Sequence, residues 1–97
     1  MITINVAEET SDFAENKDIA RKLRIDTLEP AIENKEKVVI DFNGVLSATQ
    51  SFIHALISEV IRKWGIDSLD QIMFKNCNEQ IKTIVNIVVD YVQDGIF

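Results

Sequence analysis

The sequence is short of basic residues, of cysteine and of histidine, and each shortage excludes a class of protein. Ten Lys and Arg stand against sixteen Asp and Glu, which gives a formal net charge of -6 over 97 residues. A nucleic-acid-binding surface needs clustered positive charge, and these basic residues are scattered among acidic ones, so we exclude that class. One cysteine cannot form an internal disulfide bond, and one histidine with no cysteine or second histidine nearby predicts no metal site. We therefore expect neither a metal nor a cofactor.

Long hydrophobic runs are also missing. No stretch resembles a secretory signal or is long enough to span a membrane, and Met1 leads directly into a strand pattern. The sequence contains no repeat, no low-complexity tract and no interdomain linker. We therefore expect a cytoplasmic protein in which residues 1–97 form one domain with one core. The content of 46% hydrophobic and 27% charged residues is typical of a folded soluble protein.

The segment that the rest of the chain surrounds begins with Val38-Val39-Ile40. This run is β-branched and too short for a helix, which is typical of a strand buried on both faces. Asn43-Gly44 ends the run, because glycine adopts backbone angles that other residues avoid. A loop rich in hydroxyl side chains follows, and an amphipathic helix begins after it. Open α/β sheets usually place their functional surface at such a strand-to-helix loop, so we expect the site here.

Hydrophobic periodicity predicts the other elements. They are two strands at residues 2–6 and 71–74 and three helices at residues 16–33, 53–64 and 76–94. The first strand alternates between hydrophobic and polar residues and fits a half-covered edge. Phe13 is expected to return to the core, on a second short strand. Asn76 and Glu79 together predict the start of the last helix, because their side chains can satisfy its free amide hydrogens.

The last predicted helix is hydrophobic over more of its surface than one sheet face requires. Its core-facing side chains are expected to be Ile81, Ile84, Val85, Val88 and Val92. The stripe is widened by three more side chains, Ile87, Val89 and Tyr91. This surplus indicates either a homodimer or partner contact or extra burial against the first helix. Asp94-Gly95 is expected to end the helix and to leave Ile96 and Phe97 as a hydrophobic tail.

The helix predicted over residues 16–33 has an inconsistent hydrophobic face. On a regular helix its hydrophobic side chains fall on two nearly opposite faces, with Ile19 and Leu23 on one and Ile25, Leu28 and Ile32 on the other. Pro30 adds a second difficulty, because inside a helix it removes a hydrogen bond and clashes with the preceding turn. Either the helix breaks near Asp26 and Thr27 caps a second piece, or one kinked helix leaves Ile19 and Leu23 exposed as a contact strip.

A motif around the central strand carries a family resemblance. It consists of Asp41, Phe42, Gly44, Val45, Ser51 and Phe52. The motif resembles the STAS fold of the bacterial anti-anti-sigma factors, and more closely the STAS-like domains of unknown function, over most of the chain from about Asp18 onward. The resemblance implies a small layered α/β fold, with a mixed sheet of three or four strands and helices mainly on one face. It also implies one helix over residues 16–33, which favours the kinked form.

The resemblance implies a non-enzymatic regulatory module that docks a protein partner through the loop from Gly44 to Phe52. The residues expected to contact the partner are Asn43, Ser47, Thr49, Gln50, Ser51 and His54. By resemblance the partner is an ATPase or kinase of the histidine-kinase-like class. The phosphorylated serine of anti-anti-sigma factors aligns with Gln50, which cannot be phosphorylated, so docking carries over but the phosphorylation switch does not. The alternative is that Ser47 or Thr49 only caps the helix that follows.

Asp41 suggests a second class of function. The segment from Val39 to Val45 also resembles the first motif of haloacid-dehalogenase-type phosphatases, in which a strand-end aspartate attacks a phosphoryl group with the help of Mg²⁺. This chain has Asn43 where the proton-transferring carboxylate of that motif should stand, and an amide cannot act as a general acid. We therefore expect no catalytic residues. Asp41 is better explained as an acceptor for amide hydrogens of its own loop.

Overall fold

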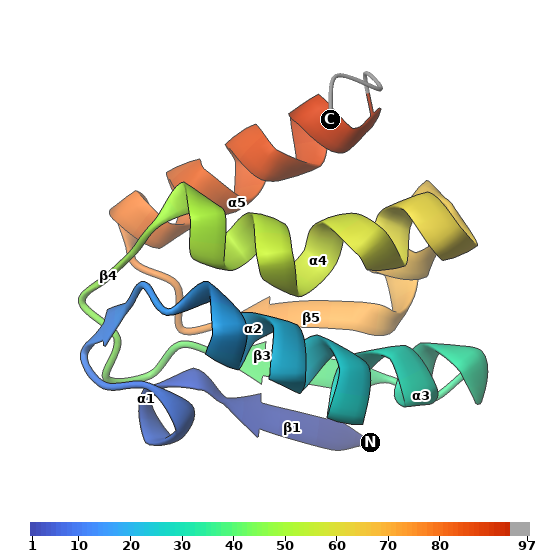
Figure 1. Cartoon of the computed structure of the whole chain (residues 1–97), viewed down its shortest axis with the longest axis horizontal. Helices are drawn as coiled ribbons and strands as arrows, with labels where there is room; N and C mark the ends of the chain where they lie inside the picture. Colours follow the sequence, from blue (N-terminus) through green and yellow to red (C-terminus); the bar gives the residue numbers. More distant parts are fainter. Residues whose placement is uncertain (94–97) are drawn as a thin grey trace.

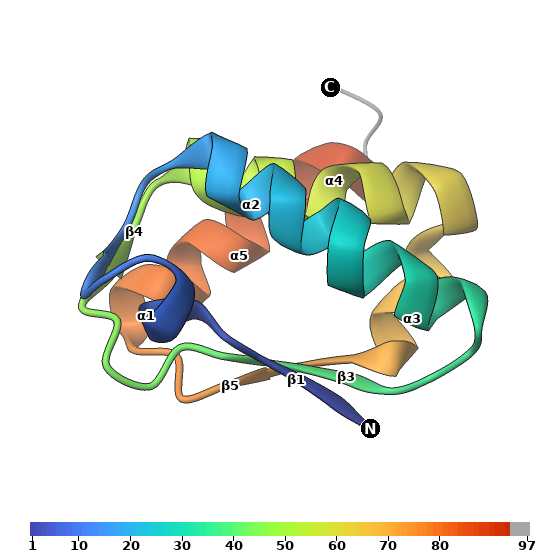
Figure 2. The same cartoon turned by 60° about the horizontal axis from the view of Figure 1, so that its bottom comes forward.

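The computed structural model describes residues 1–93. Its main sheet has the strand order β1 (Ile2–Asn5), β3 (Val38–Asp41) and β5 (Ile72–Lys75), and both pairs are parallel. Figures 1 and 2 show the long helices gathered on one face of this sheet. The middle strand β3 is buried along Val38, Val39 and Ile40, as the sequence predicts for a strand covered on both faces.

The other elements follow the predicted order with several additions. They are α1 (Val6–Glu9), β2 (Phe13–Ala14), α2 (Lys17–Leu23), a π-helical turn η1 (Arg24–Leu28), α3 (Glu29–Glu33), β4 (Ser47–Ala48), α4 (Gln50–Trp64), a 3₁₀ helix η2 (Ile66–Gln71) and α5 (Glu79–Gln93). The small strands β2 and β4 form a second parallel sheet. None of the helices described over residues 1–93 is both long and hydrophobic enough to cross a lipid bilayer.

The predicted α/β class with helices on one face is confirmed, but the expectation of a mixed sheet was wrong. Both strand pairs of the main sheet are parallel. The chain passes through α2, η1 and α3 between β1 and β3, and through α4 between β3 and β5. Each connection therefore returns the chain to the same end of the sheet, so successive strands run in the same direction.

A π-helical turn resolves the inconsistent face of the first long helix. Residues 17–33 are helical without a break, and η1 joins α2 to α3. The Glu29 amide donates to the carbonyl of Arg24, five residues earlier. This bond spans one residue more than the α-helical bond, so it shifts the hydrophobic face. The expected exposed strip was wrong as a result, because Leu23 and Leu28 are both buried, Ile19 is half-buried, and Ile25 is 47% exposed instead.

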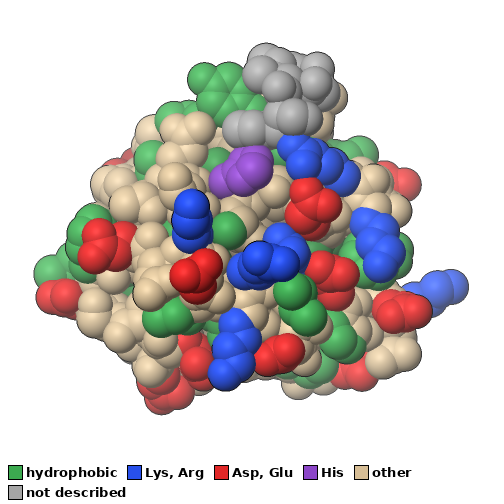
Figure 3. Space-filling view, viewed as in Figure 1, with side chains coloured by type: hydrophobic (Ala, Val, Ile, Leu, Met, Phe, Trp, Pro, Cys, Tyr) green, Lys and Arg blue, Asp and Glu red, His purple; other side chains and the backbone are tan. Residues whose placement is uncertain are grey.

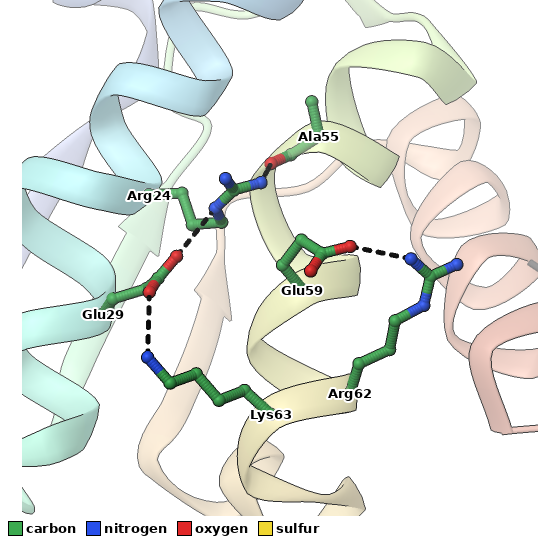
Figure 4. Close-up of polar contacts among 6 residues, drawn as sticks. All are labelled: Arg24, Glu29, Ala55, Glu59, Arg62 and Lys63. Carbon is green, nitrogen blue, oxygen red and sulfur yellow. Dashed lines mark hydrogen bonds and ion pairs between the residues drawn. The ribbon is translucent and has the colours of Figure 1, made fainter.

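A polar clamp holds this helical segment against α4 (Figure 4). The Arg24 guanidinium donates from Nε to Glu29 Oε2 at 2.9 Å and from Nη1 to the Ala55 carbonyl oxygen at 3.0 Å. The other oxygen of the same carboxylate, Glu29 Oε1, lies 3.9 Å from Lys63 Nζ of α4. The π-helical turn thus places Arg24 where it bonds across the helix interface.

The structure differs from the prediction at Phe13 and at the start of the last helix. A second short strand at Phe13 is confirmed as β2, but Phe13 is 42% exposed and the buried side chain is that of Ala14. Successive side chains of a strand point to opposite sides, so only one of the two can face the core. The last helix begins at Glu79 rather than near Asn76, with the side chain of Asn78 accepting from the Ile81 amide.

The two longest helices bury hydrophobic faces, and that of α5 is mostly the one predicted. In α4, Ile53, Leu56, Ile57 and Val60 are buried, and in α5 so are Ile81, Val85 and Val88. The three side chains that widen the α5 stripe are only partly covered: Ile87 and Val89 are half-buried and Tyr91 is exposed. The expectations for Asp94 to Phe97 lie outside the described residues.

Candidate functional site

The loop from Gly44 to Phe52 leaves the carboxyl end of β3 and leads through β4 into α4. Gly44 has a φ of +86°, which favours glycine, and a side chain there would lie 3.5 Å from the Cβ of Ala7. Farther along, β4 is paired with β2 through Phe13 opposite Ser47 and Ala14 opposite Ala48. Two backbone amides of the loop, those of Leu46 and Thr49, donate to carbonyls of the β2 segment at 2.7 and 3.0 Å.

Two side chains hold the other edge of β4, that of Asn78 just before α5 and that of Gln80 in its first turn. The Gln80 amide accepts from the Ala48 backbone N–H at 3.0 Å and donates to the Ala48 carbonyl at 2.9 Å. Asn78 Nδ2 donates to the carbonyl of Leu46 at 2.7 Å. The side chain of Gln80 therefore occupies the hydrogen-bonding positions that a further strand would use.

The outer edge of β2 is closed in a similar way. The Ser11 hydroxyl accepts from the Phe13 amide at 3.1 Å and donates to the Phe13 carbonyl at 3.2 Å. One side chain on each side thus satisfies the outward backbone groups of the β2–β4 sheet. An exposed strand edge is a template for pairing with another chain, and here both edges are occupied.

Asp41 at the end of β3 fixes the start of the loop. Its Oδ1 accepts from the Asn43 backbone amide and from Asn76 Nδ2, both at 2.9 Å. The hydrogen bond from Asn76, followed by that from Asn43, lowers the pKa of the Asp41 carboxyl below its ordinary value of 3.8, and the charge of Lys75 adds to this effect. The expected bonding to loop amides is confirmed. Asn76 was not foreseen, because it comes from the loop after β5.

The six residues expected to contact a partner are not equally accessible. Asn43, Gln50 and Ser51 are exposed, whereas Ser47, Thr49 and His54 are half-buried. Thr49 Oγ1 accepts from the Phe52 amide at 3.1 Å and caps α4, which is the alternative role that the sequence left open for it.

Three of the six residues come together in one shallow hollow between the amino ends of α2 and α4. The hollow is lined by Lys17, Gln50, Ser51, His54 and Ala55. Burial lowers the pKa of His54 from its ordinary value of 6.5, and the positive charge of Arg62 acts in the same direction against the opposite effect of Glu59. His54 is thus biased toward its neutral form, and Figure 3 shows its side chain at the surface.

Sequence reasoning missed two hydrophobic side chains at this site. Leu46 is 68% exposed and Phe13 is 42% exposed. Leu46 directly follows Val45, which is buried, and two successive residues of an extended segment cannot both face the core. That signal could have identified Leu46. The exposure of Phe13 depends on its pairing with Ser47, more than thirty residues along the chain.

The chemistry available at the site is hydrogen bonding and hydrophobic contact. Among residues 1–93, no three His, Cys, Asp or Glu side chains are grouped so that they could hold a metal ion. Cys77 lies near the carboxyl end of β5, and burial raises the pKa of its thiol, so it is biased toward the unreactive protonated form.

Comparison with known proteins identifies one family. A family model described as a STAS-like domain of unknown function matches residues 20–82, well over half of the chain. The matched segment contains the central strand β3, the loop with β4, and α4. No curated protein and no solved structure matches the chain.

Proposed function

The chain belongs to the family of STAS-like domains of unknown function, and from this premise we propose that it is a non-enzymatic regulatory module that docks a protein partner through the loop from Gly44 to Phe52. The observation that carries the proposal is the arrangement of this loop. Its backbone groups bond inward to β2 and to α5, whereas Leu46, Gln50 and Ser51 point outward and are exposed.

Such a loop suits recognition because its shape is set before the partner arrives. Ordering flexible segments on binding costs free energy, and a loop that is already held in place avoids most of this cost. The polar contacts that hold the loop come from three places: the β2 segment, the amino end of α5, and the Thr49 cap of α4.

The class of partner follows from the resemblance to anti-anti-sigma factors. By that resemblance the partner is an ATPase or kinase of the histidine-kinase-like class. Gln50 stands where those factors carry the phosphorylated serine, so binding here is not switched by phosphorylation at that position. The proposal of a non-enzymatic module is supported by Asp41, whose Oδ1 accepts two hydrogen bonds, and by Asn43 in place of a second carboxylate.

Steric blocking of the loop tests the proposal. Ser51 is exposed in the first turn of α4, so Ser51→Trp adds bulk at the surface without filling the core. Thr83→Trp is the matched control, because Thr83 is exposed on α5. Candidate ATPase domains of the histidine-kinase-like class, purified and titrated by calorimetry, are expected to bind Ser51→Trp at least about tenfold more weakly, a loss of about 1.4 kcal/mol. Equal affinities of both variants for every domain that binds would overturn the proposed surface.

The non-enzymatic character has its own test. In the presence of Mg²⁺, hydrolysis of p-nitrophenyl phosphate by the purified chain is expected to stay at the level of buffer. Asp41→Ala, the change that would remove the only strand-end aspartate of the motif, is expected to behave in the same way. Turnover by the natural chain that disappears in Asp41→Ala would show an enzyme built on Asp41.

A further inference from the structure

Phe13 and Leu46 belong to neighbouring segments of the chain at the β2–β4 sheet. In the register of the two strands Phe13 is opposite Ser47, and the amide of Leu46 donates to the carbonyl of Asp12, the residue before Phe13. Both side chains are exposed, at 42% and 68%. Single exposed hydrophobic residues are common on proteins, but here two large ones come from segments that are far apart in the sequence and paired with each other at the proposed docking loop, Gly44 to Phe52.

The closed edges of this sheet restrict how a partner can bind. Ser11 occupies the outward groups of β2, and Gln80 occupies those of β4. A partner strand could not add to either edge without displacing these bonds, so strand addition is disfavoured. A partner that docks here must use contacts between side chains, and Phe13 and Leu46 are exposed large hydrophobic side chains of these two segments.

Acidic residues precede and follow Phe13 in the sequence, and the first lysine after it is Lys17. The first sixteen residues contain four exposed carboxylates and no lysine or arginine: Glu8, Glu9, Asp12 and Glu15. On the other side, the side chain of Glu79, next to the Asn78 that bonds Leu46, is 94% exposed, with Lys82 Nζ 3.8 Å from its Oε1. Figure 3 shows hydrophobic side chains beside acidic ones at the left end of the molecule, the end at which Figure 1 places β4. A partner with positive charge around the contact would therefore be attracted and oriented.

We propose that Phe13 and Leu46 form the hydrophobic anchor for a partner surface that has an apolar centre and a rim of lysine and arginine. This inference rests on the proposed function, because it names the chemistry of the partner that docks at the same loop. The inference differs from the proposed function in where it places the main contact. That contact is on β2 and on Leu46, the residue just before Ser47 and the other hydroxyl residues of the loop.

Designed peptides test the inference. The probe is an amphipathic helix built from leucine and lysine, and the control is the same pattern built from leucine and glutamate. Titrated into the isotope-labelled chain and followed by amide NMR, the lysine peptide is expected to shift the signals of residues 12–14 and 46–47 first. The glutamate peptide is expected to leave them unchanged, because its charge has the same sign as the surface.

Two pairs of substitutions complete the experiment. Phe13→Ser with Leu46→Ser is expected to weaken binding of the lysine peptide at least about tenfold. The matched control is Ile25→Ser with Met73→Ser, which removes two side chains of similar exposure, 47% and 59%, from other surfaces and is expected to bind like the natural chain. Asp12→Lys with Glu15→Lys keeps the anchor, reverses the charge of the two carboxylates nearest to Phe13 in the sequence, and is also expected to weaken binding.

The outcomes separate this inference from the proposed function. Shifts confined to residues 49–51 would overturn the anchor and leave the docking loop in place. Absent binding, shifts spread over the whole acidic surface, or equal binding by the glutamate peptide or by the Phe13 and Leu46 variant would also overturn the anchor. The proposed docking function of the loop is tested separately, by the measurement with Ser51→Trp.

Discussion

The side chain of Gln80 bonds the backbone of Ala48 in both directions, accepting at 3.0 Å and donating at 2.9 Å. The two residues are 32 positions apart, and the bonds join the first turn of α5 to the strand that leads into α4. The loop from Gly44 to Phe52 is therefore shaped by three separate segments of the chain: its own residues, the β2 segment and α5. A change in the position of α5 would reach the loop directly through Gln80.

Replacing one atom of that contact tests its importance. Gln80→Glu keeps the oxygen that accepts from the Ala48 amide but places a second oxygen against the Ala48 carbonyl, where a donor is needed. We expect the free energy of unfolding to fall by about 1–2 kcal/mol, because one hydrogen bond is lost and an acceptor is left unpaired. Urea denaturation measures the change.

The neighbouring residue provides the control for Gln80. Glu79→Gln changes the charge in the opposite sense on a side chain that is 94% exposed. It is expected to alter the free energy of unfolding by no more than about 0.5 kcal/mol. If the two substitutions had the same effect, the bonds between Gln80 and Ala48 would not hold the loop.

Periodicity predicted β3, α4 and β5 because each of them buries a regular hydrophobic pattern, and that pattern is a property of neighbouring residues. The motif from Asp41 to Phe52 indicated the candidate site, and that site stays a prediction. Ser11, Asn76 and Gln80 could not be predicted in the same way. Each is a polar residue outside the loop, and its role depends on which backbone groups the fold brings beside it. No local pattern carries that information.

The π-helical turn makes a prediction about two neighbouring hydrophobic residues. Leu28 is fully buried and Ile25, three positions earlier, is 47% exposed, although the sequence placed both on one face. Leu28→Ala is expected to lower the free energy of unfolding by about 2–5 kcal/mol, because it leaves a cavity in the core. Ile25→Ala is expected to cost less than about 0.5 kcal/mol. Thermal and urea unfolding of the two variants measure this difference. Comparable losses in the free energy of unfolding would show that Leu28 and Ile25 do not face the core and the solvent as described.

A deletion tests the same turn in a different way. Leu23 and Leu28 are five residues apart, and removing the exposed Asp26 would bring them to the four-residue spacing of a regular α-helix. We expect this deletion to leave a folded protein with a moderate loss of stability. Deletion of the exposed Glu59 in α4 is the control. It would rotate the rest of that helix by about 100°. Val60 would then move to the exposed position of Glu59 and Arg62 to the buried position of Ile61, so folding is expected to fail. Circular dichroism and amide NMR spectra distinguish the results, and equal damage by both deletions would contradict the role given to the turn.

The bond between Asp41 and Asn76 predicts a dependence on pH. The hydrogen bonds lower the pKa of the folded-state carboxyl below 3.8, with that from Asn76 contributing most. A carboxyl with a lowered pKa binds fewer protons in the folded state than in the unfolded state. Its contribution to stability is therefore present above about pH 4 and is lost as the pH falls through the folded-state pKa.

Removal of the Asn76 amide is the sharpest test of this linkage. Asn76 has a φ of +58°, so Asn76→Gly deletes the donor and keeps a residue that accepts this backbone conformation. Carbon-detected NMR titration of the Asp41 carboxyl is expected to show a higher pKa in Asn76→Gly than in the natural chain. The loss of stability between pH 6 and pH 3 should be correspondingly smaller in the variant, because less of the folded state then depends on the ionised carboxyl. An unchanged Asp41 pKa would mean that the contact between the loops after β3 and β5 does not stabilise the charged form, and that the Asn43 amide and the charge of Lys75 account for the lowered pKa.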